Sequence, residues 1–569
     1  MKFVGSQLAY YLSDTDFKKN SKVLLKYLVL LAVVVVFFSV LFHVIMEWEG
    51  REYSWITGFY WTFTVMSTLG FGDITFESDL GRLFSTLVLL SGIFLLLIFL
   101  PFAFIRHFYV PLLESRKKNR VPRSVPAAIQ DHIIICSYDV IAIDFIARLK
   151  QENIPYYVIE NDPKIALKFY DEEEIPVLFG QFDDENTFIQ ARVKNARMVF
   201  VNRDDIINTK IILIIRQLAP EVTIVALAAD NETIDVQQLS GADHVLPVKK
   251  WLGEQLANRV NAQQARSHPI GQYEDLLFAE LPVQYTPLVT QTIRETKLRQ
   301  KYGVSIVGIW ERGRLKPITG DEQLVNDSVL VIMGNHDQLN SIDGLFRDYP
   351  ANPNPVVIIG GGRVGSAAAQ ALHKSGIAVN LIDRDPVLGK KAKPYCKNVF
   401  VGKASDYELL KRAGIMEAPS VLLSTHDDAM NIHLASYCRR LNKDIRIVSR
   451  ITKARNIDII HKAGADFVLS YATLGSEAAL SIAKGQELTI LGEGINLFIT
   501  PVPHQLENTT LGESGIGAKT GLSVIAVKQN AAVSTQVSAD TKLPKGAEII
   551  LLGNIEMRNR FNEVYEVGE

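Results

Sequence analysis

Cysteine is scarce in this sequence, and neither sign of charge predominates. The 569 residues include three cysteines, Cys136, Cys396 and Cys438, which are far apart and odd in number. They form neither a disulfide framework nor a zinc motif, and this usage suits a reducing cytoplasm, so we expect core residues. The formal net charge is −2, and nothing in it indicates a nucleic-acid partner. A chain of this length has room for three or four domains of roughly 150 residues.

Long apolar runs are confined to the N-terminal fifth of the chain. Residues 23–46 are interrupted only by Lys26 and His43, and residues 83–105 carry no charge. Both runs are long enough to cross a bilayer core of ~30 Å. A signal peptide would have an apolar core of about half this length followed by a small-residue cleavage site, and neither feature is found. We therefore predict two membrane spans.

A shorter apolar segment lies between the two runs. Residues 55–67 are too few to span a bilayer, which favours a re-entrant helix at membrane depth. The next six residues, Thr68-Leu69-Gly70-Phe71-Gly72-Asp73, contain alternating glycines. Glycine accepts φ > 0, and alternating it with ordinary residues lets successive carbonyls point the same way. Rings of such carbonyls can replace the hydration shell of K⁺.

This segment resembles the T-V-G-Y-G-D signature of potassium channels, with Leu69 in place of Val and Phe71 in place of Tyr. Both substitutions are apolar, although Phe71 lacks the hydroxyl that usually braces the filter from behind. The resemblance implies K⁺ sites at Thr68, Leu69, Gly70 and Phe71. One copy of the segment supplies a quarter of such a carbonyl cage, so we expect a homotetramer in a lipid bilayer.

The charged residues that flank the two spans predict how the chain is oriented in the membrane. Basic residues precede the first span and follow the second: Lys18, Lys19, Lys22, Lys26, Arg106, Arg116, Lys117, Lys118, Arg120 and Arg123. Acidic residues predominate between the spans: Glu47, Glu49, Glu52, Asp73, Glu77 and Asp79. Both termini are therefore expected in the cytoplasm of a bacterial cell, with the chain in the inner membrane. The acidic residues either concentrate cations at the pore mouth or form an ordinary solvated loop.

Two helix-breaking residues fall within the second span. Gly92 lies in mid-helix, where glycine costs ~1 kcal/mol relative to alanine. In two-span potassium channels a glycine at about this distance beyond the filter is the inner-helix hinge, and we favour that role over a close helix contact. Pro101 should kink the helix, because it removes a backbone hydrogen bond.

The remainder of the chain repeats once, at an offset of roughly 220 residues. The strand at 132–135 matches 356–359, the strand at 156–160 matches 378–383, and Gly241-Ala242-Asp243 matches Gly464-Ala465-Asp466. In each copy apolar strands alternate with helical stretches, which predicts a parallel sheet covered by helices on both faces. The final ~80 residues of each copy are β-rich. Each copy is thus expected to have a Rossmann lobe and a smaller β-rich lobe.

Pore and repeats together resemble the RCK (regulator of potassium conductance) channels, in which cytoplasmic RCK domains form a ring that pulls on the inner helices. The expected fold is an α-helical two-span pore-loop membrane domain followed by two tandem α/β Rossmann-type RCK domains. The expected boundaries are 1–20 for an N-terminal cytoplasmic segment, 21–110 for the pore domain, 111–130 for a basic, proline-bearing linker, 131–350 for the first RCK domain and 351–569 for the second.

The second copy carries a dinucleotide-binding motif. Gly360-x-Gly362-x-x-Gly365 follows a strand and precedes a helix, and Asp383 ends the next strand about 20 residues later. The glycines allow a tight turn, close approach of phosphate and close helix packing, while the helix N-terminus offers amides to a pyrophosphate. Asp383 can accept from ribose hydroxyls and would repel a 2′-phosphate, which favours NAD or an adenine nucleotide (ADP, ATP) over NADP. The candidate site also includes Arg363, Val364 and Arg384.

Family resemblance extends this site. It implies that Ser405 and Asp406 lie near the adenine, and that Thr425, His426 and Arg450 lie near the other end of the ligand.

The first copy departs from the motif. Cys136, Tyr138 and Ile141 occupy the three glycine positions, which disfavours a dinucleotide. Glu160 keeps the ribose-type acid and Asp183 matches Asp406, so a degenerate site for a mononucleotide or metal ion stays open beside a purely structural role.

Calcium regulates some RCK proteins. Two acidic groups could hold it, 171–174 and Asp230 with Glu232, but neither resembles an EF-hand loop. The position of any divalent site therefore stays open.

We expect a ligand-gated potassium channel and no enzyme. A potassium uptake transporter with Rossmann regulatory domains is the alternative, but it would place four pore-loop units in one membrane chain. A membrane-tethered oxidoreductase is disfavoured, because no acid–base constellation is recognisable after either Rossmann lobe.

Overall fold

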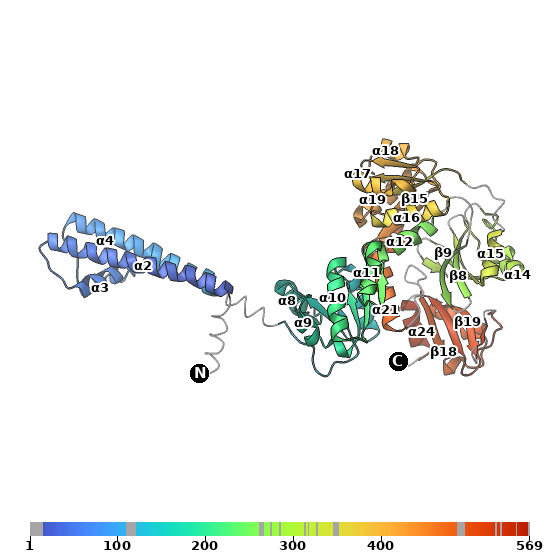
Figure 1. Cartoon of the computed structure of the whole chain (residues 1–569), viewed down its shortest axis with the longest axis horizontal. Coiled ribbons are helices and arrows are strands. Elements are labelled where there is room, and N and C mark those ends of the chain that lie inside the picture. The colour runs from blue at the N-terminus through green and yellow to red at the C-terminus, as the bar shows by residue number, and fades with distance from the viewer. Residues whose placement is uncertain are drawn as a thin grey trace. The chain divides into compact units, whose positions relative to one another are not determined.

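The structure is a computed structural model of the whole chain (Figure 1). It describes residues 15–109, 121–260, 267–273, 276–283, 286–311, 314–316, 318–325, 328–344, 352–485, 496–529, 532–534, 537–553 and 555–566. Part of the expected N-terminal segment, the first half of the basic linker and the expected boundary between the two copies lie outside these residues. Two compact units are distinguished, residues 1–122 with 162–174, and the rest.

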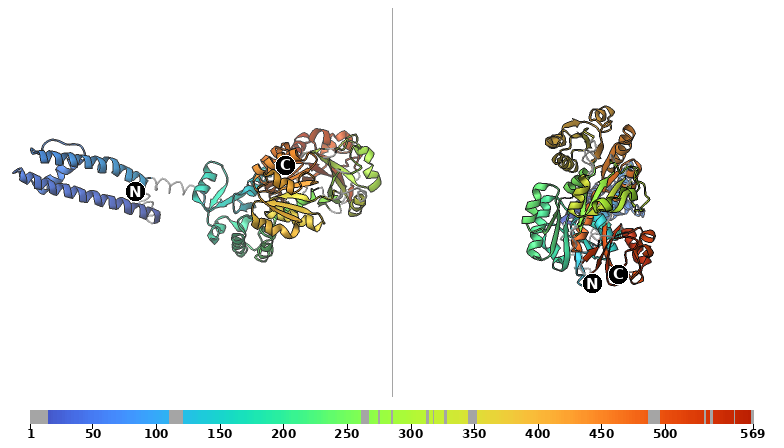
Figure 2. Two further views of the ribbon diagram at one scale, coloured as in Figure 1. Left: turned by 90° about the horizontal axis from the view of Figure 1, so that it is seen from above. Right: turned by 90° about the vertical axis from the view of Figure 1, so that its right-hand side faces the viewer.

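The membrane segment consists of two long helices and a short one. The helix α2 (Thr15–Trp48) is followed by α3 (Trp55–Met66) and by α4 (Asp79–Gly92), which continues through η1 (Ile93–Phe99), α5 (Leu100–Phe104) and η2 (Ile105–Tyr109). Leu25–Trp48 and Asp79–Phe104 are long and apolar enough to cross a membrane, with mean hydropathies of 3.1 and 2.8. In both Figures 1 and 2 these helices run side by side.

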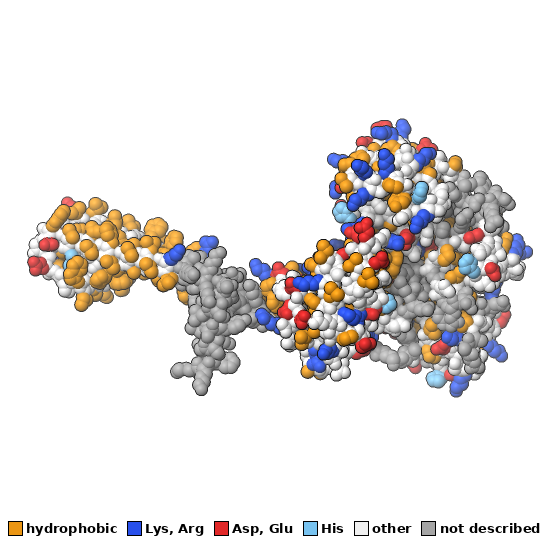
Figure 3. All heavy atoms as spheres, viewed as in Figure 1, with side chains coloured by type: hydrophobic (Ala, Val, Ile, Leu, Met, Phe, Trp, Pro, Cys, Tyr) orange, Lys and Arg blue, Asp and Glu red, His pale blue; other side chains and the backbone are white. Residues whose placement is uncertain are grey.

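Aromatic packing holds the short helix against the long ones. Trp61 of α3 lies 4.9 Å from Phe42 of α2 and 5.7 Å from Phe84 of α4, measured between ring centroids. Apolar side chains cover most of the face of this pair that Figure 3 shows, and both helices expose many large apolar residues. An exposed apolar surface of this extent is typical of a lipid-facing segment.

The first Rossmann lobe is a six-stranded parallel sheet in the order β3-β2-β1-β4-β5-β6. Its strands are β1 (His132–Ile135), β2 (Tyr156–Glu160), β3 (Val177–Phe179), β4 (Ala196–Val201), β5 (Thr223–Leu227) and β6 (His244–Leu246). Its helices are α7 (Val140–Gln151), α8 (Pro163–Asp171), α9 (Glu185–Gln190), α10 (Asp205–Leu218), α11 (Ile234–Leu239) and α12 (Val248–Asn258). Strand β1 is buried along its whole length and β4 from Met198 to Val201, as expected for a parallel sheet covered on both faces.

The second Rossmann lobe repeats this topology, with the order β14-β13-β12-β15-β16-β17. Its strands are β12 (Val356–Ile359), β13 (Val379–Asp383), β14 (Asn398–Val401), β15 (Ser420–Leu423), β16 (Arg446–Ile451) and β17 (Phe467–Ser470). Its helices are α16 (Arg363–Lys374), α17 (Pro386–Ala392), α18 (Tyr407–Arg412), α19 (Asp428–Leu441), α20 (Ile457–Lys462) and α21 (Tyr471–Ala483). The predicted tandem repeat is confirmed.

Each copy ends in an antiparallel lobe. The first has the strand order β10-β9-β11-β8-β7, from β7 (His268–Tyr273), β8 (Leu276–Pro282), β9 (Ser305–Glu311), β10 (Arg314–Lys316) and β11 (Val329–Gly334), with α13 (Ile293–Thr296), α14 (Leu298–Tyr302) and α15 (His336–Gly344). The second has the order β18-β21-β19-β20, from β18 (Asn496–Pro501), β19 (Ser523–Gln529), β20 (Ala532–Ser534) and β21 (Glu548–Gly553), with α22 (Leu511–Ser514), α23 (Ile516–Thr520) and α24 (Ile555–Val564). One hydrophobic cluster joins the two sheets, with Trp310 and Met333 from the first and Ile525 and Leu552 from the second.

The two copies exchange helices. Helix α12 of the first copy packs on α16 of the second, and α21 of the second packs on α7 of the first. Glycines permit both crossings: a β-carbon on Gly253 would lie 2.4 Å from the Val364 carbonyl oxygen, and one on Gly475 would lie 2.7 Å from Ile141. The repeats therefore form one body, in which each Rossmann lobe is completed by a helix from the other.

Candidate functional site

The predicted filter has an alternating backbone. Thr68, Gly70 and Gly72 have φ of +62°, +47° and +75°, whereas Leu69 and Phe71 between them are not in the left-handed region. Left-handed conformations at every second residue are what successive carbonyls need to face the same side. The segment therefore has the backbone form that the sequence predicts for a column of carbonyl oxygens.

The short helix α3 braces this segment. The Thr64 carbonyl oxygen accepts hydrogen bonds from the amides of Leu69 (2.9 Å) and Gly70 (3.1 Å). The Tyr60 hydroxyl donates to Asp73 Oδ2 at 3.0 Å, and Trp61 Nε1 donates to the Ile74 carbonyl at 3.1 Å. No pattern in the sequence indicates a bracing role for these two aromatic residues. They provide side-chain bracing that does not depend on a hydroxyl at Phe71.

Gly92 is a packing residue in this structure. A β-carbon there would lie 2.3 Å from the Met66 backbone, so the second span touches the end of α3. The helix also changes at this point, because α4 ends at Gly92 and a π-helical stretch, η1, begins at Ile93. Pro101 follows at the start of α5, between the π-helical stretches η1 and η2. The hinge role of Gly92 stays a prediction, and the close helix contact is present.

The glycine-rich loop of the second copy has the geometry of a phosphate cradle. Gly360 follows β12 with φ of +106°, and Gly362 stands at the N-cap of α16 with no side-chain cap and nothing within 4 Å of where its β-carbon would be. A β-carbon on Gly365 would lie 1.8 Å from the Gly360 carbonyl oxygen, which shows how closely helix and loop approach. The amides at the start of α16 are therefore open to an anion.

Asp383 is held at the end of β13 by backbone amides. Its Oδ2 accepts from Gly361 N–H, and its Oδ1 accepts from Asp385 N–H at 2.7 Å. The carboxylate is thereby fixed beside the glycine-rich loop, the position that a ribose-binding acid requires. Arg384, the next residue, is exposed.

Other predicted residues follow neighbouring strands at the same edge of the sheet. Thr425 follows β15 and donates to Asn431 Oδ1 at 2.7 Å, while His426 is exposed. Ser405 and Asp406 follow β14, and Asp406 caps α18 by accepting from Glu408 N–H at 3.0 Å. These side chains lie at the carboxyl ends of parallel strands, where open α/β sheets bind ligands.

Ser424 belongs to the same candidate site, although the sequence did not predict it. Its hydroxyl lies 3.0 Å from the Ile359 carbonyl oxygen and 2.7 Å from that of Gly360. This contact ties β15 to the turn of the glycine-rich loop, and the signal for it was its place directly before Thr425.

Arg450 is a buried cation at this edge, with 8% of its surface exposed. Its Nη2 donates to Thr452 Oγ1 at 2.9 Å, and burial lowers its pKa. The first copy adds two charged residues, Asp230 and Lys249. Asp230 forms an ion pair with Arg363 of the second copy. Burial lowers the pKa of Lys249, and the guanidinium groups of Arg363 and Arg450 lower it further. From the sequence, Asp230 is a candidate only for a calcium site together with Glu232.

The same edge of the first copy is closed. Asp139 caps α7 by accepting from Ala142 N–H at 2.8 Å, and Ile141 is fully buried. Glu160 is buried, and its Oε1 accepts from Asn161 N–H at 2.8 Å. Asp183 is paired with Lys210 at 3.2 Å. The geometry favours a structural role over a degenerate ligand site.

The cysteines are inert core or near-core residues. Burial raises the pKa of Cys136 and Cys438 to about 12 and that of Cys396 to about 11. Among the described residues no group of three or more histidine, cysteine or acidic side chains is placed to hold a metal ion.

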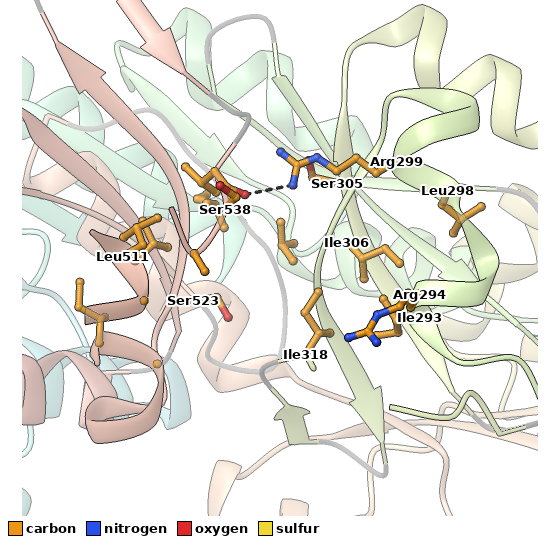
Figure 4. A pocket seen from close by; sticks show the side chains of 18 of the residues that line it. Ile293, Arg294, Leu298, Arg299, Ser305, Ile306, Ile318, Leu511, Ser523 and Ser538 are labelled. Atoms are coloured by element: carbon orange, nitrogen blue, oxygen red, sulfur yellow. Dashed lines mark hydrogen bonds between the residues drawn. The ribbon is translucent and has the colours of Figure 1, made fainter. Parts of the chain in front are cut away.

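A separate cavity of about 600 Å³ lies between the two β-rich lobes (Figure 4). Ile306 and Leu511 line it, together with Arg294, and Arg299 Nη1 donates to the Val537 carbonyl at 3.1 Å across it. None of the predicted nucleotide-binding residues lines this cavity.

Three family models match four regions of the chain. The ion channel model matches residues 29–106, the TrkA-N domain model matches 133–247 and 356–471, and the TrkA-C domain model matches 278–347. The TrkA-C match covers the first β-rich lobe, although the second has a related antiparallel sheet.

The chain is also similar to known potassium channels. Potassium channel protein 1 of Methanocaldococcus jannaschii is 28% identical over 40% of this chain and 74% of its own length. Voltage-gated potassium channel Kch of Escherichia coli is 25% identical over 38% of this chain and about half (51%) of its own length. The solved structure of the GsuK channel bound to NAD is 34% identical, covers 97% of this chain and is itself covered completely (100%), with a TM-score of 0.58.

Proposed function

Because this chain belongs to the family of potassium channels with RCK domains, we propose that it forms a homotetrameric, potassium-selective pore opened or closed by nucleotide binding to its second RCK domain. The observation that carries the pore is the alternation of left-handed conformations at Thr68, Gly70 and Gly72. Four such segments around one axis would present stacked rings of carbonyl oxygens to K⁺, with Thr68, Leu69, Gly70 and Phe71 supplying the sites.

Domain limits follow from this assignment. We place the pore at residues 21–110, the linker at 111–130, the first RCK domain at 131–350 and the second at 351–569. The basic flanks of the spans put both RCK domains in the cytoplasm, and we assign the chain to a bacterial inner membrane. Force from the cytoplasmic ring would reach the second span through the linker, with Gly92 as its hinge.

The regulatory ligand is NAD or an adenine nucleotide (ADP or ATP). The open N-terminus of α16 suits a pyrophosphate, and Gly362 leaves room for it. The fixed carboxylate of Asp383 suits a ribose diol and disfavours a 2′-phosphate. The solved structure of the GsuK channel bound to NAD supports the same ligand class for this chain.

A bound nucleotide here is a sensor ligand that is not consumed. The ligand biases the ring by its different affinities for two ring shapes. For Ca²⁺ we propose no site, because the described residues offer no cluster of three suitable ligands.

The test is recording from the purified full-length protein in a planar bilayer, first in K⁺ against Na⁺ and then with NAD, ADP and Ca²⁺ on the cytoplasmic side. Selective K⁺ current that changes with NAD or ADP is expected. Selective current indifferent to every nucleotide would overturn the sensor assignment, and current without selectivity would overturn the filter assignment.

A further inference from the structure

An ion pair between the two Rossmann lobes occupies the edge of the proposed nucleotide site. Arg363 is the first residue of α16, directly after the glycine-rich loop. Its Nε and Nη2 donate to Asp230 Oδ1 and Oδ2 at 2.6 and 2.8 Å, and Asp230 lies beyond β5 of the first copy. This two-pronged geometry is the one that guanidinium groups use for phosphates as well as for carboxylates.

The surroundings of this pair are cationic. Burial is the main cause that lowers the pKa of Lys249, and the guanidinium groups of Arg363 and Arg450 lower it further. Arg450 is almost fully buried, and its Nε has no hydrogen-bond partner among the described residues. Arg363, Lys249 and the positive end of α16 thus act on Asp230, while the nearby Asp205 carboxylate is held by the amides of Ala229 and Asp230 and by the Thr233 hydroxyl. A ligand with two phosphate groups carries more negative charge than the single carboxylate of Asp230, so it is the stronger electrostatic partner for Arg363.

The pair also lies where the lobes cross. Arg363 precedes Val364, whose carbonyl oxygen would lie 2.4 Å from a β-carbon on Gly253 of α12. Lys249 is one helical turn before Gly253 on α12. Any change in the partner of Arg363 therefore occurs at the contact between α12 and α16.

The pair is weak enough to be exchanged. About half of each side chain is exposed, 52% for Arg363 and 53% for Asp230. Exposed ion pairs contribute little stability, because water screens them and two long side chains must be ordered. A phosphate on the open N-terminus of α16 adds hydrogen bonds to backbone amides that Asp230 does not use.

We propose that Asp230 is an internal substitute for a ligand phosphate on Arg363. When a nucleoside diphosphate group binds the glycine-rich loop, Arg363 exchanges Asp230 for phosphate, and an ion pair between the two copies is replaced by one with the ligand. Asp230 thereby lowers nucleotide affinity. It also couples nucleotide binding in the second copy to the first copy, because binding breaks the ion pair between them. This inference rests on the proposed nucleotide site.

Calorimetric titration of the purified full-length channel with ADP, NAD and inorganic pyrophosphate tests it. Asp230→Asn removes the competing charge, and it is expected to tighten ADP binding about three- to fivefold. Glu232→Gln removes a nearby exposed charge and is the matched control, with an expected change of less than about twofold. Arg363→Gln should weaken binding, and Asp230→Asn should have no further effect on that background.

Three outcomes would overturn the inference and leave the proposed site intact: unchanged affinity in Asp230→Asn, an equal gain in Glu232→Gln, or an equal gain from Asp230→Asn on the Arg363→Gln background. The last two outcomes would mean that Asp230 acts by long-range electrostatic repulsion and not by competing for Arg363. Absence of binding to the unmodified channel would overturn the nucleotide site itself together with this inference. Thermal denaturation of each variant confirms that the fold is kept.

Discussion

The two Rossmann lobes share one topology and differ at the start of one helix. In the first lobe the N-terminus of α7 is capped by the Asp139 carboxylate, and Ile141 fills the space beside it. In the second lobe Gly362 leaves the N-terminus of α16 uncapped, and Gly365 lets the helix approach the loop. The Asp139 carboxylate occupies the place beside the first amides of α7 that an anionic ligand would need, whereas the corresponding place at α16 is open.

The largest effect is expected from giving α16 an acidic N-cap of the kind that α7 has in Asp139. Gly362→Asp places a carboxylate where phosphate should bind, and the space is open, so the fold should persist. Like charges in contact cost several kcal/mol, so NAD or ADP binding should fall by about 100-fold or more. Titration calorimetry measures this loss of nucleotide affinity. Gly362→Ser introduces a neutral cap, is the matched control and should retain more affinity than Gly362→Asp. Equal affinities for the two variants would show that phosphate does not bind there.

A smaller effect is expected from the paired acids of the two copies. Asp383→Asn keeps the size of the side chain and removes the charge that accepts from ribose, so nucleotide affinity should fall about tenfold. Glu160→Gln, the matched change in the first copy, should leave affinity unchanged. K⁺ over Na⁺ selectivity should be the same in both. Equal losses from both variants would mean that both copies bind nucleotide.

The helix exchange should make stability depend on pH at one of its two crossings. Glu477 of α21 lies against Arg148 of α7 at 3.3 Å, and burial raises its pKa to about 7 from 4.5. Because the folded protein binds this proton more tightly, the stabilisation is complete below pH ~4.5 and is lost as pH rises to ~7. Stability should fall by about 1 kcal/mol between pH 6 and 8, and Glu477→Gln should remove this dependence. The melting temperature of the full-length protein measures it. An identical pH profile in the variant would show that another group titrates.

The smallest effect is expected from opening the first copy. Asp139→Gly removes the cap of α7 at a cost of a few tenths of a kcal/mol up to about 1 kcal/mol. No second equivalent of nucleotide should bind, because Ile141 still blocks the approach of loop and helix. Calorimetric stoichiometry measures this, and a second bound equivalent per chain would show that the cap alone closes the first copy.

Local patterns predicted the fold and the outline of the site. Apolar strands, their offset between copies and the glycines at 360, 362 and 365 are short-range signals, and the structure has a strand, a turn and a helix there. The alternation at Gly70 and Gly72 is of the same kind. Each of these features depends on residues that are neighbours in the sequence.

The missed features depend on distant residues. Asp230 and Arg363 are 133 positions apart, and no local pattern pairs them. Tyr60 and Asp73 meet only because the chain turns back after α3. A glycine inside a helix, such as Gly253 or Gly475, indicates a close contact, but the sequence does not show which residue it contacts.

The helix exchange also sets when the first lobe can finish folding during synthesis. Asp144 of α7 and Ser476 of α21 are bonded although they are 332 positions apart. At about 5–20 residues per second a ribosome needs roughly 20–60 s to make that stretch. Until then α7 lacks its contact with α21, which includes the approach of Gly475 to Ile141. We expect the nascent first copy to depend on chaperones in that interval, and premature termination before α21 to yield an aggregation-prone fragment, detectable as insoluble product in ribosome-arrest experiments.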